Sequence, residues 1–118
     1  MRPAWLEIDL GAVRENHRAL RRTVGVGCEV IPVVKANAYG HGLVAVGKVL
    51  EDEGVGRVAV ALVEEGVVLR EAGVSCGILV LGASLPEQAE EVVEYDLTQS
   101  VCALEVIEAL SKVADKRQ

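Results

Sequence analysis

The sequence predicts an α/β fold built from parallel strand–helix units, and three observations support this. Apolar runs rich in valine recur at residues 29–34, 57–62 and 77–82. Each run is followed by a segment whose apolar residues have helical spacing. Successive runs begin roughly 20–27 residues apart, which is the size of one strand–helix unit. Parallel strands buried on both faces read as continuous apolar runs of this kind.

The length and composition indicate one globular domain with a modest core. The chain has 118 residues, of which 51% are hydrophobic, and it contains no Phe. The core is therefore expected to consist of Val, Leu, Ile and Ala. The net charge of -6 argues against a nucleic-acid partner, because phosphate binding needs clustered Lys and Arg. No apolar run approaches the length of a membrane span, so no membrane partner is expected.

The cysteines predict a reducing compartment. Cys28, Cys76 and Cys102 are odd in number and widely spaced, without a CxxC pattern. We expect reduced, mostly buried thiols in a cytoplasmic protein, with no metal site. Residues 1–20 lack the apolar segment of a signal peptide, which agrees with a cytoplasmic location.

The pattern along the chain predicts a leading strand and helix, followed by four strand–helix units. Strands are expected at residues 4–9, 29–34, 57–62, 77–82 and 96–101. Helices are expected at about residues 10–22, 43–53, 63–72, 84–93 and 104–115. Two architectures fit this order: half of a (βα)8 barrel, which typically takes about 250 residues, and a small open doubly wound sheet. The pattern alone does not separate them.

Local signals define several helix ends. Asp9 is expected to cap the first helix, and Gly54 to end the second. Residues 84–87 read as a capping box that starts with Ser84. The acids at residues 51–53 oppose the dipole of the helix that they end. The helix over residues 63–72 opens with two acids, which suits its N-terminus.

The basic side chains form one cluster at the end of the first predicted helix. It consists of Arg18, Arg21 and Arg22. Cations near a helix C-terminus interact favourably with the helix dipole. We therefore expect this cluster to stabilise the helix rather than to bind a ligand.

The chemically informative segment is VVKANAYGHG, at residues 33–42. Lys35 comes where a predicted buried strand gives way to a loop, and ligands bind at such carboxyl ends in barrels and open α/β sheets. Partial desolvation there would favour the neutral amine, which can attack a carbonyl and form a Schiff base. A lysine that extends along the surface at a strand end fits the residues equally well.

Other side chains of this segment could assist a ligand. Tyr39 offers a phenol to the same cavity. Free amides near Gly40 and Gly42 could receive a phosphate at the start of the next helix. His41 could act as a general base, although a structural hydrogen bond is its commoner role in such a loop. Asn37 is expected to hold the loop through its own backbone.

These residues carry a family resemblance. VVKANAYGHG resembles the cofactor-lysine segment of alanine racemases. WLEIDLGAVRENHRAL resembles the opening of that family, and VALVEEGVVLREAG followed by ILVLG resembles its next two units. The likeness spans nearly all of the chain. The VKAN core is shared with related pyridoxal-phosphate decarboxylases, whereas VKANAYGHG as a whole is specific to the racemases.

The resemblance implies that residues 1–118 are the N-terminal part of a pyridoxal-phosphate-binding domain, the first half of a TIM-type (βα)8 barrel. It implies that Lys35 carries pyridoxal 5'-phosphate as a Schiff base and serves as the base on one face of the substrate α-carbon. Tyr39 would help to hold the cofactor phosphate. The enzyme would interconvert L-alanine and D-alanine, supply D-alanine for cell-wall peptidoglycan, and work as a homo-oligomer.

The resemblance also implies that the chain holds only part of the site. The acid/base on the opposite face is, in this family, a tyrosine from the C-terminal domain of a partner subunit. Neither Tyr39 nor Tyr95 corresponds to it, so we expect a truncated racemase with little activity on its own. Two alternatives are a non-catalytic pyridoxal-phosphate-binding module and an inactive fragment. Gly66 and Val67 depart from the alanine and polar residue usual in the family, which affects packing rather than chemistry.

Overall fold

The sheet of the computed structural model is parallel, as the sequence predicts, and the structure describes residues 2–118. Its strands, in spatial order, are β1 (Arg57–Val60), β2 (Gly77–Val80) and β3 (Thr98–Gln99). β1 and β2 pair over four residues, and β3 pairs with the end of β2. Residues 30–34 run beside β1 and are joined to it by a single bridge between Val33 and Ala59.

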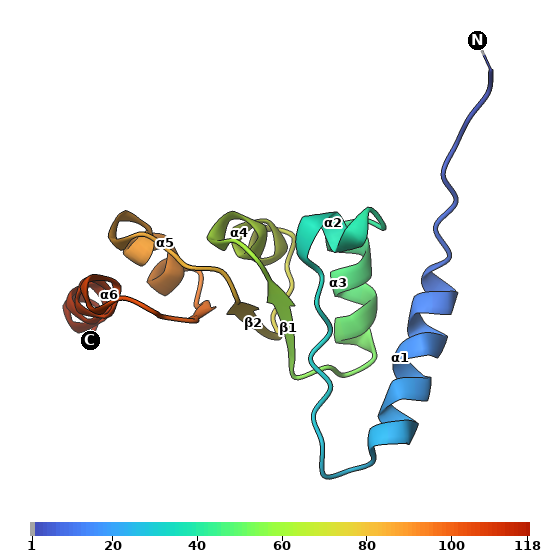
Figure 1. Cartoon of the computed structure of the whole chain (residues 1–118), viewed down its shortest axis with the longest axis horizontal. Helices are drawn as coiled ribbons and strands as arrows, with labels where there is room; N and C mark the ends of the chain where they lie inside the picture. Colours follow the sequence, from blue (N-terminus) through green and yellow to red (C-terminus); the bar gives the residue numbers. More distant parts are fainter. Residues whose placement is uncertain (1) are drawn as a thin grey trace.

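The helices and strands together form an open arc (Figure 1). The helices are α1 (Leu10–Val24), α2 (Lys35–Tyr39), α3 (Leu43–Asp52), α4 (Val63–Glu71), the short 3₁₀ helix η1 (Pro86–Gln88), α5 (Ala89–Glu94) and α6 (Leu104–Lys116). The radius of gyration is 16.3 Å, whereas a compact chain of this length has roughly 13–14 Å. The arc and the N-terminal segment that leads away from it account for the difference. The arrangement confirms the predicted α/β class.

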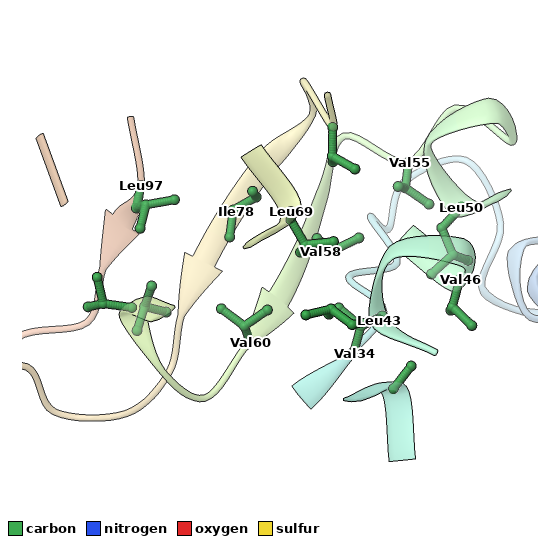
Figure 2. Close-up of a cluster of buried hydrophobic side chains, with 14 of the residues drawn as sticks. Val34, Leu43, Val46, Leu50, Val55, Val58, Val60, Leu69, Ile78 and Leu97 are labelled. Atoms are coloured by element: carbon green, nitrogen blue, oxygen red, sulfur yellow. The ribbon is translucent and has the colours of Figure 1, made fainter. Parts of the chain in front are cut away.

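The core lies between the sheet and the helices α3 and α4 (Figure 2). Val58 and Val60 of β1 are completely buried, and Leu69 of α4 packs in the same cluster. Ile78 and Val80 of β2 are also buried, while Gly77 and Leu79, which alternate with them, are half-buried. Burial of each such side chain contributes about 1.5–3 kcal/mol, so aliphatic residues stabilise the sheet without help from Phe.

Three predicted strands differ from the structure. The prediction of a strand at residues 4–9 was wrong: residues 2–9 are irregular, because no other described strand lies beside them to accept their hydrogen bonds. Residues 29–34 are not wholly buried, since Val33 is 39% exposed and only one neighbouring strand is present. The strand predicted at 96–101 is reduced to the two residues of β3.

The cap of α1 is confirmed and that of η1 is shifted. The Asp9 carboxylate accepts a hydrogen bond from the Ala12 amide at 3.1 Å, as expected. The Ser84 cap was wrong, because its hydroxyl is buried without a hydrogen-bond partner among the described residues. Instead Gln88 Oε1 accepts from the Leu85 amide at 2.9 Å. Proline at the first position of η1 moves the start of the helix by one residue.

The acids that end α3 are explained by bonds to other elements. Glu51 Oε1 accepts from the amides of Ser75 and Cys76 at 2.6 and 2.7 Å and from the Ser75 hydroxyl at 2.7 Å. The Ser75 bonds, foremost that of its hydroxyl, lower the pKa of the Glu51 carboxyl. Glu53 accepts from Arg14 and Arg18 of α1 at 2.6 and 2.7 Å. These contacts offset the unfavourable position of the acids in the helix dipole.

The expected place of the basic cluster is confirmed for Arg21 and Arg22, which lie in the last turn of α1, but the same contacts give Arg18 a different role. Arg18 binds the Glu53 carboxylate, and Arg21 donates to the Glu53 carbonyl at 3.3 Å, so both tie α1 to α3. Hydrogen bonds from Arg18 and Arg14 lower the pKa of Glu53 to about 2. Stabilisation of the α1 C-terminus is therefore not the main role of Arg18.

The thiols are free, but the expectation that most are buried was wrong. Cys28 and Cys102 are exposed because both lie in irregular segments outside the core, and only Cys76 is partly buried. Burial raises the pKa of the Cys76 thiol. Within residues 2–118, no helix has both the length and the apolar composition needed to cross a bilayer. Over the same range, no three His, Cys, Asp or Glu side chains are grouped so that they could hold a metal ion.

Candidate active site at the carboxyl edge of the sheet

Lys35 lies at the edge of the sheet where residues 30–34, β1, β2 and β3 end, which we call the carboxyl edge. Parallel pairing fixes its place. The Val34 amide donates to the Ala59 carbonyl at 2.8 Å, and the Ala59 amide donates to the Pro32 carbonyl at 2.9 Å. Val34 is buried, and the chain leaves the sheet directly after it. The predicted placement of Lys35 at a strand end is therefore confirmed.

The segment after Lys35 is a left-handed turn, which the sequence did not predict. Ala36, Asn37, Ala38 and Tyr39 have φ values of 52°, 57°, 53° and 55°. Left-handed backbone costs roughly 1–2 kcal/mol for each residue with a Cβ atom. Strain of this kind persists only where the surroundings fix it, and it gathers at functional sites. The turn thus marks the carboxyl edge as a candidate site.

Hydrogen bonds inside residues 34–43 close the turn. The Ala38 amide donates to the Val34 carbonyl at 2.9 Å, and the Ala38 side chain is buried in the core. Asn37 Oδ1 accepts from the Leu43 amide at 2.9 Å. The Asn37 side chain thus binds the first amide of α3, and the Asn37 carbonyl, which accepts from the Gly40 and Gly42 amides, holds the loop as expected.

The amides near the two glycines have acceptors within the chain. The Gly42 amide donates to the Asn37 carbonyl, the Leu43 amide to the Asn37 side chain, and the His41 amide to the Ala38 carbonyl. The amides of residues 40–43 are therefore not free for a phosphate, contrary to expectation, whereas those of Val44 and Ala45, in the first turn of α3, have no acceptor among the described residues. His41 Nδ1 lies 2.9 Å from the Ala38 carbonyl oxygen, which supports the structural role of this histidine.

Glu65 is a further residue of the site, which sequence reasoning had treated only as an acid that opens α4. Its Oε1 atom accepts from the Ala36 amide at 2.8 Å. Its Oε2 atom accepts from the amides of Ala61 and Leu62 at 2.8 and 3.0 Å. Glu65 thus joins the turn after Lys35 to the end of β1, and α2 and α4 lie beside each other at this edge in Figure 1. Its contact with Ala36 spans 29 residues, so no local sequence signal could have revealed it.

The two predicted site side chains, Lys35 and Tyr39, share the turn and face solvent. Lys35 is exposed and Tyr39 is 61% exposed, so the expected desolvation of Lys35 is absent within the described chain. No hydrogen bond joins the two side chains among residues 2–118. Leu62 and Leu81, which follow β1 and β2, are 54% and 47% exposed. The carboxyl edge therefore offers an amine, a phenol and apolar surface to a ligand.

An apolar cavity of about 420 Å³ lies between α1, α3 and residues 30–34, and Ala38 and His41 of the turn also line it. Its wall includes His17, which is only 4% exposed. Burial and the nearby Arg21 lower the pKa of His17, which favours the neutral imidazole. Lys35 and Tyr39 do not line this cavity. We therefore assign His17 to packing and place the candidate site at the exposed carboxyl edge.

The family of the chain follows from its similarity to known proteins. Residues 8–118 match the family model described as "Alanine racemase, N-terminal domain". The chain belongs to this family. The match covers the carboxyl edge, including the turn and Glu65.

Known racemases match almost the whole chain. An alanine racemase of Methanococcus maripaludis is 44% identical over 97% of the chain, which spans 31% of that protein. The solved alanine racemase of Clostridium difficile 630 superposes with a TM-score of 0.92 and 35% identity over 99% of the chain, which covers 31% of that structure. The histidine racemase of Leuconostoc mesenteroides subsp. sake matches with a TM-score of 0.80 and 28% identity, over 92% of this chain and 29% of its own.

The structural match confirms the predicted architecture, in which parallel strand–helix units form the first half of a barrel domain. The chain spans about 30% of the length of the relatives that it matches. The racemase from Clostridium difficile 630 has also been solved in complex with cycloserine, so a small molecule binds that protein.

Proposed function

We propose that this chain is the cofactor-binding part of a pyridoxal-phosphate-dependent alanine racemase, and that Lys35 Nζ binds the cofactor covalently. The observation that supports the proposal is the exposed Lys35 amine at the carboxyl edge, on a strained turn. The relatives that match the chain are racemases. Ligand sites of parallel α/β folds lie at this edge.

The residues at the carboxyl edge fit this cofactor. A primary amine such as that of Lys35 condenses with an aldehyde and releases water. The Tyr39 phenol, in the same turn, can donate a hydrogen bond to a phosphate oxygen. Leu62 and Leu81 expose apolar surface against which an aromatic ring can pack. When bound, pyridoxal phosphate supplies an electron sink for charge on the substrate α-carbon.

The role of Lys35 then follows from its amine. Lys35 Nζ, when free and neutral, can accept a proton from one face of the α-carbon and return it. A second acid/base must act on the other face, and we expect it outside residues 1–118. The physiological role that we propose is D-alanine supply for cell-wall peptidoglycan, in the cytoplasm, where thiols such as Cys28 stay reduced.

Reductive trapping tests the covalent role of Lys35. The chain is mixed with pyridoxal phosphate, reduced with borohydride and mapped by peptide mass spectrometry. We expect the pyridoxyl group on Lys35, and its loss in Lys35→Ala. Lys48→Ala, which changes an exposed lysine of α3, is the matched control and should label as the parent chain does. Labelling spread over several lysines, or unchanged in Lys35→Ala, would refute the proposal.

A second amino-acid substrate is a specific alternative, because a histidine racemase shares this architecture. An amino acid that binds productively should displace Lys35 from the cofactor and so lower the trapped fraction. We expect L-alanine to lower it at concentrations at which L-histidine does not. A stronger effect of L-histidine would favour the alternative.

A further inference from the structure

The carboxylate of Glu65 has two separate tasks, one for each oxygen. Oε2 accepts from the amides of Ala61 and Leu62, at the junction of β1 and α4. Oε1 accepts from the amide of Ala36 at 2.8 Å. Glu65 lies in the first turn of α4, where the helix dipole favours the charged carboxylate. The first task is a local helix cap, whereas the second reaches a different element.

The Ala36 amide is the one that matters for Lys35. It belongs to the peptide group that joins Lys35 to Ala36, and Ala36 is the first left-handed residue of the turn. Holding this amide therefore fixes the plane of the peptide that follows Lys35, and with it the direction in which the side chain leaves the backbone.

The remaining hydrogen bonds of the turn are local. Within residues 2–118, the other hydrogen bonds of residues 36–42 stay within residues 34–46, as in the bonds from Ala38 to Val34, from Leu43 to Asn37 and from Val46 to Gly42. These bonds hold the shape of the turn but do not join it to α4. Glu65 is the hydrogen-bonded link between the turn and α4.

We propose that Glu65 is the positioning residue for Lys35: its Oε1 atom holds the start of the left-handed turn, so that the Lys35 amine meets the cofactor in one orientation. This inference rests on the proposed function. Glu65 itself touches neither cofactor nor substrate in this scheme. Its effect passes through the Ala36 amide.

Glu65→Gln separates the two tasks. The amide side chain has one acceptor oxygen, whereas the carboxylate has two. The side-chain oxygen of the Glu65→Gln variant can still accept from the amides of Ala61 and Leu62. Its NH2 group then faces the Ala36 amide, and because both groups are donors, no hydrogen bond forms between them. Glu65→Ala removes both tasks. Glu64→Gln is the matched control, because Glu64 is the neighbouring acid in the same turn and, among residues 2–118, accepts only from Gln88, at 3.2 Å.

Three measurements are made on each variant of the full chain: hydrogen exchange, cofactor titration and urea unfolding. Hydrogen exchange reports the Ala36 amide, and absorbance titration with pyridoxal phosphate, checked by trapping on Lys35, reports cofactor affinity. In Glu65→Gln we expect the Ala36 amide to exchange faster and the affinity to fall about tenfold, the effect of one lost hydrogen bond to a charged group. The urea midpoint should stay close to that of Glu64→Gln, which itself should match the parent chain in all measurements.

The outcomes separate the inference from the proposed function. Faster Ala36 exchange with unchanged affinity would show that Glu65 only supports the fold, and would overturn the inference. Unchanged Ala36 exchange in Glu65→Gln would overturn it as well. The inference would also be overturned if, in both Glu65 variants, the loss of cofactor affinity were explained entirely by a smaller folded fraction. If the parent chain traps no cofactor on Lys35, the proposed function fails and the inference fails with it, even where the exchange data show the Ala36 bond.

Discussion

The two edges of the sheet use charged side chains in different ways. At the carboxyl edge, Lys35 is exposed and makes no ion pair within the described chain. At the opposite edge, where the strands begin and which we call the amino edge, the charged groups are occupied. Glu51 binds the segment before β2, and Glu53 binds α1. The carboxylates of the amino edge therefore hold elements of the fold together, whereas the Lys35 amine at the carboxyl edge remains exposed to solvent.

Arg70 shows what the amino edge does. Its guanidinium donates to the carbonyls of Val74, Cys76, Tyr95 and Asp96 at 2.7–3.0 Å. One side chain thus holds the loops that enter β2 and β3. In barrels of parallel strands, the amino edge commonly serves stability and the carboxyl edge chemistry. The same division is seen here within a single layer of four strand-like segments.

The largest expected effect concerns catalysis at the carboxyl edge. We expect residues 1–118 alone to racemise alanine about 10²–10⁴-fold more slowly than a full-length racemase of the family, because we expect the general acid for the second face to lie outside them. A coupled assay for D-alanine measures the rate. Turnover near that of a full-length enzyme would show that Tyr95 or His41 supplies the second group.

The next effect concerns stability at the amino edge. Arg70→Ala should lower the free energy of unfolding by about 3 kcal/mol, because partly buried carbonyls lose charged donors. Urea unfolding measures the change, and Arg22→Ala, an exposed arginine of α1, serves as the control. Under conditions in which Arg70→Ala stays folded, trapping on Lys35 should persist. A folded Arg70→Ala variant that no longer traps the cofactor would contradict the assignment of stability to the amino edge and of ligand binding to the carboxyl edge.

At both edges, the sequence predicts the strands but not the contacts between distant residues. The apolar runs that contain Val58, Val60 and Ile78 predict strands. The apolar run before Lys35 predicts that this lysine lies at a strand end. These features depend on neighbours in the chain. The hydrogen bond that Ala36 donates to Glu65 and those that Ser75 and Cys76 donate to Glu51 join residues 24 to 29 positions apart. Periodicity contains no information about such pairs.

The left-handed turn escaped prediction for a different reason. Asn37 tolerates positive φ, but alanine and tyrosine rarely adopt it. Local propensity therefore argues against the conformation that Ala36, Ala38 and Tyr39 have. Packing of Ala38 and the bond to Glu65 override that propensity. The capping error at Ser84 has the simpler cause that two adjacent positions could start the helix and Pro86 favoured the second.

The two outermost strand segments of the sheet each have an unpaired side, and these sides predict that copies of the chain associate. Residues 30–34 pair with β1 on one side only, and β3 pairs only with β2 among the described strands. Unpaired strand sides attract another chain. Leu104 and Ile107 of α6 add exposed apolar surface, which also favours association. We therefore propose that the chain forms homo-oligomers.

Light scattering at micromolar concentration tests this. We expect a mass of at least about twice the monomer value of 12.5 kDa. A clean monomer would show that β1, β2, β3 and residues 30–34 form a stable open α/β domain without a second copy. Association that persists while Lys35 trapping is unchanged would place the contact away from the carboxyl edge.

The smallest effect is the pH dependence of the contact between α1 and α3. The pKa of Glu53 falls from 4.5 to about 2 because Arg18 and Arg14 bind its carboxylate. A depressed pKa in the folded state means that the stabilisation is fully present above pH 4.5 and is lost as the pH falls toward 2. Glu53→Gln should therefore lower the urea midpoint at pH 7, and the difference from the parent chain should shrink below pH 4.5. Glu108→Gln, an exposed acid of α6, should show no such pH dependence. If the difference in urea midpoint between Glu53→Gln and the parent chain stayed constant down to pH 2.5, the variant would have lost packing rather than charge. Cofactor trapping on Lys35 at pH 7 should be unchanged in either case.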